Sequence, residues 1–206
     1  HDEVKGDLRK EAKDLKDFVI VRSDGSPVFH LANVVDDIAM KITHIIRGDD
    51  HVENTYRHVA LFRSLGAQAP KYAHLPMIIN QQGKPYSKRD GAAFVGEFRE
   101  KGFLSQALFN YLALLGWSPG EDREKMTREE MVRLFTLDRV RSSPSQMDIK
   151  KLTHLNAEYV AEMPLDKFAV EAERALAGID WAAGIEKDYF LKVCAMMQTR
   201  THTLLH

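Results

Sequence analysis

A helix-like segment followed by a strand-like segment occurs twice in the first eighty residues, and this alternation restricts the fold more than any other feature. Apolar residues recur at helical spacing over 31–42, and residues 43–46 then read as a buried strand. The pattern repeats with a helical segment at 52–65 and a strand-like run at 75–79. Such alternation predicts a parallel sheet covered by helices, and hence an α/β domain.

Turn-forming segments flank this region on both sides. Residues 18–21 are β-prone, and the turn formers at 23–27 predict a hairpin into residues 28–30. Residues 80–91 are rich in turn formers as well and predict a loop that closes the sheet region.

The remainder of the chain is predicted to be helical. Residues 104–115 are apolar on nearly every side, as in a buried helix. Thr127 and Glu130 fit a capping box for a helix that runs to Phe135, and the Ser- and Pro-containing stretch 142–145 predicts a linker. Further helices are expected at about 148–162, 165–177 and 185–205.

Composition restricts the partners and the compartment. Lys and Arg number 29 against 30 Asp and Glu, so any contact with RNA must be local. The only cysteine is Cys194, which excludes a disulfide framework or a Cys-rich zinc site within the chain and fits a reducing, cytoplasmic setting. No apolar run approaches the roughly 20 residues that a membrane span needs. The charged first residues lack a starting Met, as expected of a piece of a longer protein.

A group of polar residues follows the first predicted strand: Arg47, Asp49, Asp50 and His51. Ligands of open parallel sheets bind at such strand ends, where an arginine can hold a carboxylate through two parallel hydrogen bonds. An ion pair between Arg47 and one of the aspartates is an equally good interpretation. Capping of the following helix explains the aspartates better than acid–base or metal chemistry does. His51 and His58 are seven residues apart rather than four, which argues against a zinc site.

The loop at 80–91 contains Ser87, Lys88 and Arg89, a hydroxyl beside two fixed cations. These groups suit phosphates whose charge grows during a displacement reaction, and one such group can supply roughly 3 kcal/mol of transition-state stabilisation. The tripeptide alone is a weak indication of function. The chain has no G-x-x-x-x-G-K-[ST] sequence, which disfavours a P-loop nucleotidase.

The chain contains three long blocks: SDGSPVFHLANVVDDIAMKITHIIRGDDHVENT, YAHLPMIINQQGKPYSKRDGA and GFLSQALFNYLALLGWSPGEDRE. In this order and spacing they resemble the glutamyl-tRNA synthetase family, over about residues 18–160. The resemblance implies a class I synthetase of α/β plus all-α architecture. It places the second half of a Rossmann-like catalytic domain at 1–102, a stem-contact region at 103–147 and the start of a helical anticodon-binding domain at 148–206.

The resemblance also implies a reaction and its participants. A glutamate–tRNA ligase activates glutamate with ATP, with Mg²⁺ expected to accompany the ATP, and transfers the glutamyl group from glutamyl-adenylate to tRNA(Glu). The implied partners are therefore glutamate, ATP and tRNA(Glu), without a membrane, and the implied protein is a cytoplasmic monomer.

Several residues acquire implied roles in amino-acid binding. Arg47 in THIIRGDD resembles the arginine that recognises the side-chain carboxylate of the substrate, and Asn33 aligns with another pocket residue. Phe29 stands where relatives commonly carry a Tyr, so the ring is kept and the hydroxyl donor is lost. The strand-end residues are implied to line the same site, with His51 also assigned to ATP: Asp49, Asp50 and His51.

Ser87, Lys88 and Arg89 match the end of the family's K-[LI]-S-K-R signature, a variant of the KMSKS loop that contacts ATP phosphates, and are implied to be catalytic. Pro85 stands where that signature begins with Lys. The nearest cation is Lys84, one residue earlier, so the phosphate contacts are expected to be weaker or reshaped.

The family's HIGH motif has no counterpart in the chain, and residues 1–206 alone are therefore expected to be unable to form adenylate. A glutaminyl-tRNA synthetase stays open as an alternative, opposed only by the closer likeness of RGDDHVENT to the glutamyl group. The shortened paralogue that glutamylates a tRNA base is disfavoured by the helical tail. A non-catalytic RNA-binding module at 103–206 lacks support from the near-neutral charge. A small-molecule nucleotidyltransferase would leave the tail unexplained.

Overall fold

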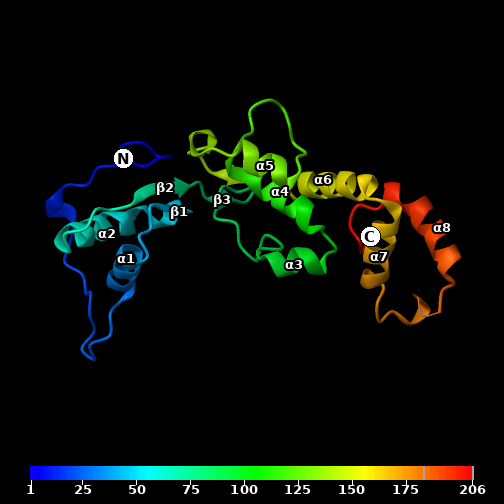
Figure 1. Cartoon of the computed structure of the whole chain (residues 1–206), viewed down its shortest axis with the longest axis horizontal. Coiled ribbons are helices and arrows are strands. Elements are labelled where there is room, and N and C mark those ends of the chain that lie inside the picture. Colours follow the sequence, from blue (N-terminus) through cyan, green and yellow to red (C-terminus); the bar gives the residue numbers. More distant parts are fainter. Residues whose placement is uncertain (183, 206) are drawn as a thin grey trace. The chain divides into compact units, whose positions relative to one another are not determined.

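The computed structural model describes residues 1–182 and 184–205, and the chain divides into two compact units (Figure 1). Unit 1 comprises His1–Met77 and Thr136–Ser145, and unit 2 comprises Ile78–Phe135 and Gln146–His206. Among the described residues, unit 1 has one buried apolar cluster and unit 2 has two.

Unit 1 alternates helices and strands, as the sequence predicts. Its elements are the short 3-10 turn Ala12–Asp14, α1 (Phe29–Ala39), β1 (His44–Gly48), the 3-10 turn Asp49–His51, α2 (Val52–Ser64), β2 (Lys71–Leu75) and the 3-10 turn Leu137–Arg139. β1 and β2 pair in parallel, and this register sets Arg47 opposite His74. The predicted parallel pairing is therefore confirmed.

Two strand predictions are wrong in detail. The parallel partner of β1 is Lys71–Leu75 rather than 75–79, and Pro76 separates it from the short strand β3 (Ile78–Ile79) because a proline cannot donate to a sheet ladder. β1 is also not a buried strand. Its side chains alternate between exposed and half-buried, and Ile46 is 48% exposed, so only one face of β1 is covered.

α1 begins earlier than predicted, at Phe29. The expected hairpin around 23–27 is reduced to one antiparallel bridge between Val21 and Pro27, after which the chain enters the helix directly. Buried Val34 of α1 packs in a cluster with Leu61 and Phe62 of α2. This contact holds the two helices of unit 1 together.

Unit 2 is mainly helical. Its helices are α3 (Val95–Glu100), α4 (Ser105–Gly116), α5 (Arg128–Leu134), α6 (Ile149–Glu162), α7 (Leu165–Ala175) and α8 (Lys187–Met197), with 3-10 turns at Asp180–Ala182 and Gln198–Arg200. The strand β4 (Ser145–Gln146) falls where the predicted linker was placed. Next to it, the Met147 N–H donates to the Ile79 carbonyl at 2.9 Å.

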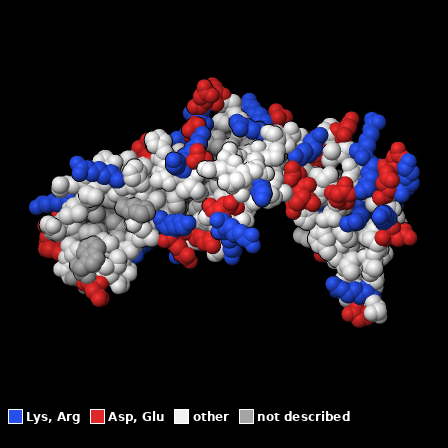
Figure 2. Space-filling model, turned by 180° about the vertical axis from the view of Figure 1, so that it is seen from behind, with Lys and Arg blue, Asp and Glu red and all other residues white. Residues whose placement is uncertain are grey.

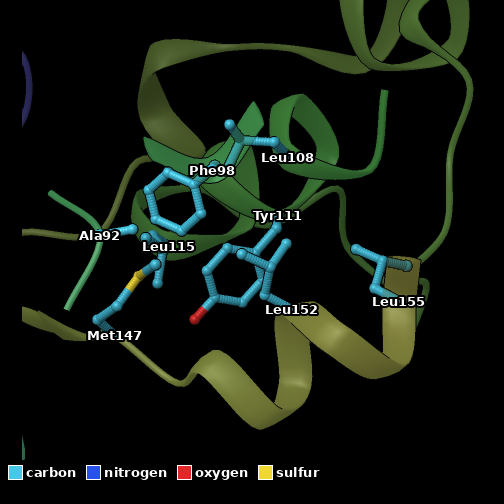
Figure 3. Packing of buried hydrophobic residues seen from close by; sticks show 8 residues of the cluster. All are labelled: Ala92, Phe98, Leu108, Tyr111, Leu115, Met147, Leu152 and Leu155. Carbon is cyan, nitrogen blue, oxygen red and sulfur yellow. The ribbon is translucent and has the colours of Figure 1, made fainter. Parts of the chain in front are cut away.

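The main core of unit 2 joins α3, α4 and α6 (Figure 3). It consists of Ala92, Phe98, Leu108, Tyr111, Leu115, Met147, Leu152 and Leu155. The Tyr111 hydroxyl accepts the Asp148 N–H at 2.7 Å, and the Asp148 carboxylate caps α6 by accepting two backbone N–H groups of its first turn. The core and the cap together fix the start of α6, close to the predicted position.

Of two further predictions for unit 2, the capping box of α5 is confirmed and the complete burial of α4 is wrong. The capping box is confirmed, since Thr127 Oγ1 accepts the Glu130 N–H and Glu130 Oε2 accepts the Thr127 N–H. α4 is not buried on every side, because Phe109 is 46% exposed and lies beneath the Arg128 guanidinium at 5.8 Å.

The last helix is shorter than predicted and ends at Met197. The chain then turns back, and the Leu204 N–H donates to the Gly102 carbonyl at 2.9 Å. Gly102 has a φ of +76°, and a Cβ at this position would lie 2.7 Å from the Leu205 nitrogen, so the contact requires glycine.

Charged side chains are mixed on the face of the molecule that Figure 2 shows, in keeping with the formal net charge of −1. Across the described residues, no helix combines the length and the apolar character that crossing a membrane requires.

Candidate functional site

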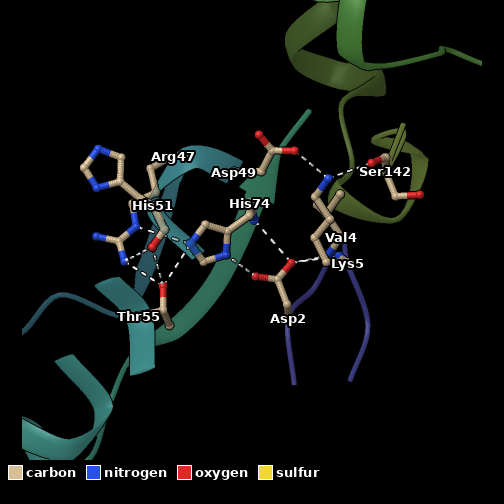
Figure 4. Close-up of polar contacts among 9 residues, drawn as sticks. All are labelled: Asp2, Val4, Lys5, Arg47, Asp49, His51, Thr55, His74 and Ser142. Carbon is tan, nitrogen blue, oxygen red and sulfur yellow. Dashed lines mark hydrogen bonds and ion pairs between the residues drawn. The ribbon is translucent and has the colours of Figure 1, made fainter. Parts of the chain in front are cut away.

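Arg47 lies half-buried near the carboxyl end of β1, and its guanidinium is held by three hydrogen bonds (Figure 4). Its Nε donates to His74 Nε2 at 3.3 Å, and its Nη2 donates to Thr55 Oγ1 at 2.7 Å and to the His51 carbonyl at 3.4 Å. Burial lowers the pKa of Arg47, but a guanidinium stays protonated in proteins. The strand end therefore presents a fixed positive charge.

Neither neighbouring aspartate pairs with Arg47, so the ion-pair interpretation is wrong for the described residues. Asp49 accepts Lys5 Nζ at 2.7 Å, and Lys5 Nζ also donates to the Ser142 carbonyl at 2.7 Å. Asp50 is exposed, with its carboxylate 3.8 Å from His51 Nε2. Helix capping by the aspartates is also wrong, because a 3-10 turn leads the chain into α2 and no side chain caps that helix.

A buried carboxylate lies behind His74. Asp2 is 3% exposed and His74 is fully buried, with His74 Nδ1 2.5 Å from Asp2 Oδ2. Asp2 Oδ1 also accepts the backbone N–H groups of His74, Val4 and Lys5. Burial alone would raise the pKa of Asp2, but these hydrogen bonds lower it overall, so Asp2 is a carboxylate at neutral pH.

Aromatic rings lie beside His51, which precedes α2, and beside His58 within α2. The Phe29 ring at the start of α1 lies 6.2 Å from the His51 ring and 5.7 Å from the His58 ring. Helical spacing puts Asn33 and Asp37 on the same face of α1 as Phe29. The positive charge of Arg47 acts on the Asp37 carboxyl, although burial raises the pKa of Asp37 overall. Phe29 and Arg47 thus both lie against His51, and a pocket formed with the other expected amino-acid-binding residues stays a prediction.

His58 is fully buried on α2, with its Nε2 3.1 Å from His30 Nδ1. Burial, assisted by the positive charge of Arg47 and by His30, lowers the pKa of His58 to about 4. His58 is therefore neutral in the folded protein at pH 7. Its Nδ1 is buried without a hydrogen-bond partner among the described residues.

This histidine predicts a pH-dependent stability. Between pH 6.5 and 4 the unfolded chain binds a proton at residue 58 that the folded chain excludes, so stability falls as pH falls, by up to about 1.4 kcal/mol per pH unit. His58→Gln should flatten this part of the curve, whereas His44→Gln, at an exposed histidine of the same unit, should not. Urea unfolding of the chain at several pH values measures the effect. Equal slopes for His58→Gln and the unaltered chain would contradict it.

In unit 2, the expected phosphate-binding loop forms a hairpin. The Tyr86 N–H donates to the Ile78 carbonyl at 2.9 Å, and Pro85 bridges Ile79, so the proline fits where the family signature has lysine. The Asp90 N–H donates to the Ser87 carbonyl and closes a tight turn.

Lys88 and Arg89 occupy the two middle positions of this turn, and both are exposed. Lys88 Nζ lies 5.0 Å from the centre of the Phe94 ring, and Arg89 forms no ion pair or hydrogen bond within the described part of the chain. Lys84 is exposed as well. The turn therefore displays cations that are available to an anionic ligand.

The Asp90 carboxylate holds the turn closed. It accepts the Ser87 N–H and Oγ–H, each at 2.9 Å, and the Asn80 Nδ2–H at 2.7 Å. These hydrogen bonds lower the pKa of Asp90. The Ser87 hydroxyl is thus a donor to Asp90, and a phosphate contact from that proton requires this bond to open.

The expected site residues fall into both units. Those of unit 1 are Phe29, Asn33, Arg47, Asp49, Asp50 and His51. Those of unit 2 are Lys84, Ser87, Lys88 and Arg89. The family resemblance also implies that Arg47 and the 87–89 turn face one pocket, which stays a prediction. Across residues 1–182 and 184–205, no group of three or more His, Cys, Asp or Glu side chains is arranged to hold a metal ion.

The sequence did not identify Thr55 and His74, whose side chains hold Arg47, or Asp2, which holds His74. Thr55 could have been found, because it lies one helical turn after His51. His74 was missed because the strand was predicted four residues too late, and Asp2 carries no local pattern at all.

A family model described as tRNA synthetases class I (E and Q), catalytic domain, matches residues 1–154. A curated glutamate–tRNA ligase from Polaromonas naphthalenivorans is 43% identical over 204 residues, which cover 99% of this chain and 44% of that protein. The one from Burkholderia vietnamiensis is 45% identical over 205 residues, with 98% and 44% covered. The chain thus spans less than half the length of these relatives.

Solved structures give the same result. A crystal structure of a glutamate tRNA ligase from Elizabethkingia meningosepticum, in complex with its amino acid, matches with a TM-score of 0.89 at 31% identity. The match covers 99% of this chain and 44% of that one. The glutamate–tRNA synthetase of Elizabethkingia anophelis matches with a TM-score of 0.90, also at 31% identity.

Proposed function

Because this chain belongs to the class I tRNA synthetase family for glutamate and glutamine (E and Q), we propose that it is part of a glutamate–tRNA ligase. The observation that carries the proposal is identity of 43–45% across almost the whole chain to proteins of that name. The parent enzyme would activate glutamate with ATP and charge tRNA(Glu), as a cytoplasmic monomer.

In the proposed reaction, a glutamate α-carboxylate oxygen attacks the α-phosphorus of ATP. The bond to the oxygen that bridges to the β-phosphorus breaks, and pyrophosphate leaves. A ribose hydroxyl of tRNA(Glu) then attacks the carbonyl carbon of glutamyl-adenylate and releases AMP. Mg²⁺ would arrive with the triphosphate, since Mg²⁺ keeps several waters and is commonly bound through substrate phosphates.

Arg47 would recognise the side-chain carboxylate of glutamate. A guanidinium without an internal carboxylate partner favours an anionic side chain over the neutral amide of glutamine. Phe29 and Asn33 would line the pocket, with Asp49, Asp50 and His51 at its rim. This charge preference is the physical ground for choosing glutamate within a family that includes both amino acids.

The cations of the 87–89 turn would bind the triphosphate of ATP. Lys88 and Arg89 are exposed at the middle of a closed turn, where they can stabilise charge that develops on the departing pyrophosphate. Lys84 would add a weaker contact, and Ser87 would donate its hydroxyl proton to a phosphate oxygen once its hydrogen bond to Asp90 opens. His51 would contact ATP from unit 1.

We also propose functional regions for the chain. Residues 1–102 would form the second half of a Rossmann-like catalytic domain, 103–147 a region that contacts the tRNA acceptor stem, and 148–206 the start of a helical anticodon-binding domain. The helices α6, α7 and α8 in the last region are consistent with this proposal.

ATP–pyrophosphate exchange tests the proposal. With tRNA(Glu) present, the complete enzyme should show exchange that depends on glutamate and not on glutamine, whereas residues 1–206 alone should show none, because they lack a HIGH sequence. Exchange driven by glutamine in the complete enzyme would instead indicate a glutaminyl-tRNA synthetase. Exchange by residues 1–206 alone would overturn the expectation that adenylate formation also needs a HIGH motif outside these residues.

A further inference from the structure

His74 is placed between a carboxylate and a guanidinium, and this fixes the position of its ring proton. Arg47 Nε can only donate a hydrogen bond, so His74 Nε2 accepts it at 3.3 Å, and the Thr55 hydroxyl, whose oxygen lies 3.0 Å from the same nitrogen, can also donate to it. The proton of the neutral ring therefore lies on Nδ1, where it is donated to Asp2 Oδ2. Asp2 in this way selects the one neutral form of His74 that can receive Arg47 (Figure 4).

The same contacts determine which part of the guanidinium is left for a ligand. Nε is engaged by His74, and Nη2 donates to Thr55 Oγ1 at 2.7 Å and, over a longer 3.4 Å, to the His51 carbonyl. In the described residues, no hydrogen bond engages Nη1. A bidentate contact with a carboxylate through the Nη1–Nη2 edge therefore uses the free Nη1 and replaces the long contact between Nη2 and the His51 carbonyl.

We propose that Asp2 and His74 are positioning residues that turn the Arg47 guanidinium so that its Nη1–Nη2 edge recognises the side-chain carboxylate of the substrate. This inference rests on the proposed function. It adds two buried residues to the specificity determinants of the amino-acid pocket, neither of which touches the substrate itself.

A purely structural role is the competing explanation. Asp2 also accepts three backbone N–H groups, so the carboxylate could serve only to attach the first residues of the chain to β2. The two explanations differ in what should happen when the backbone contacts are kept and the proton on His74 is moved.

Asp2→Asn makes that change. The amide oxygen can keep the backbone N–H groups, while the amide nitrogen faces His74 Nδ1 and donates to it. The ring proton then moves to Nε2, where it opposes the Arg47 Nε–H, and the guanidinium is expected to lose its fixed orientation. Asp7→Asn is the matched control, because Asp7 is an exposed aspartate of the same segment.

The form of His74 can be measured in the chain of residues 1–206 by long-range ¹H–¹⁵N correlation of the imidazole. We expect protonated Nδ1 and unprotonated Nε2 in the unaltered chain and in Asp7→Asn, and the reverse in Asp2→Asn. Protonated Nε2 in the unaltered chain would overturn the inference. This measurement does not depend on activity, so it stands apart from failure of the proposed function.

Two substitutions at position 74 each keep one of the two hydrogen bonds of the ring and remove the other. His74→Asn can place an amide N–H near the position of Nδ1 and keep Asp2 paired, whereas His74→Gln can place an amide oxygen near the position of Nε2 and keep the acceptor for Arg47. In the complete enzyme, His74→Asn and Asp2→Asn should raise KM for glutamate by roughly tenfold to hundredfold and change KM for ATP little. His74→Gln should raise KM for glutamate less.

Equal effects of His74→Asn and His74→Gln on KM for glutamate, in variants whose thermal unfolding is alike, would overturn the positioning role. Parallel increases in KM for glutamate and for ATP would do the same, because they would indicate general disruption. If the complete unaltered enzyme shows no glutamate-dependent exchange with tRNA(Glu) present, the proposed function fails instead.

Discussion

Arg47→Ala in the complete enzyme is expected to lower kcat/KM for glutamate by roughly 30-fold to 5,000-fold. The substitution removes the partner of a desolvated carboxylate, and such losses cost about 2–5 kcal/mol. Arg47→Lys should recover only part of the activity, because an ammonium keeps the charge but lacks the planar fork that binds a carboxylate bidentately. Initial rates of pyrophosphate exchange with varied glutamate, at saturating ATP, measure the effect.

Two comparisons make the Arg47 result specific. Arg63→Ala removes an exposed arginine from the end of α2 in the same unit and should leave KM for glutamate unchanged. Discrimination between glutamate and glutamine should also weaken in Arg47→Ala, because the charge that favours the acid is lost. A variant that keeps both its KM for glutamate and its discrimination would exclude Arg47 from substrate recognition.

Lys88→Ala and Arg89→Ala are each expected to lower the rate of adenylate formation by roughly a hundredfold to a thousandfold. Each removes one fixed cation from the turn that we propose to stabilise the departing pyrophosphate, and the loss of one comparable donor has an effect of this size. Because that charge develops in the transition state, kcat should fall more than KM for ATP rises. Single-turnover formation of adenylate, followed at varied ATP, separates the two parameters.

Lys101→Ala provides the control for the loop variants, since Lys101 is an exposed lysine just after α3 in the same unit. Lys84→Ala should have a smaller effect than Lys88→Ala, because Lys84 lies outside the closed turn. Full activity in both Lys88→Ala and Arg89→Ala would show that this loop does not act on the phosphates.

The helical part of the fold could be predicted well from local patterns. The cap residues Thr127 and Asp148 and the apolar spacing of α2 depend on contacts within one or two turns, which a sequence window contains. β2 was misplaced for the opposite reason. The apolar run that follows Leu75 predicts a strand at 75–79, but the residues that pair with β1 are Lys71–Leu75. A local pattern does not contain this information, because strand pairing depends on residues that are distant in sequence.

The same distinction applies to the candidate site. Arg47 and the 87–89 turn stand in recognisable motifs, so the sequence alone predicts them as site residues. The residues behind Arg47 could not, because Asp2 and His74 are 72 positions apart and meet only through the fold. The sequence therefore predicts the groups proposed to meet the substrate, and the structure adds the groups that orient them.

β1 has an unpaired edge as well as an exposed face, and both affect samples that contain residues 1–206 alone. In the described part of the chain β1 pairs only with β2, so the N–H and C=O groups along its second edge have no strand beside them, and Ile46 presents an apolar side chain to water. An unprotected edge of this kind can recruit an extended segment from another molecule. Dilute samples should therefore give sharper spectra than concentrated ones, and a peptide that occupies this edge should act as a solubilising agent.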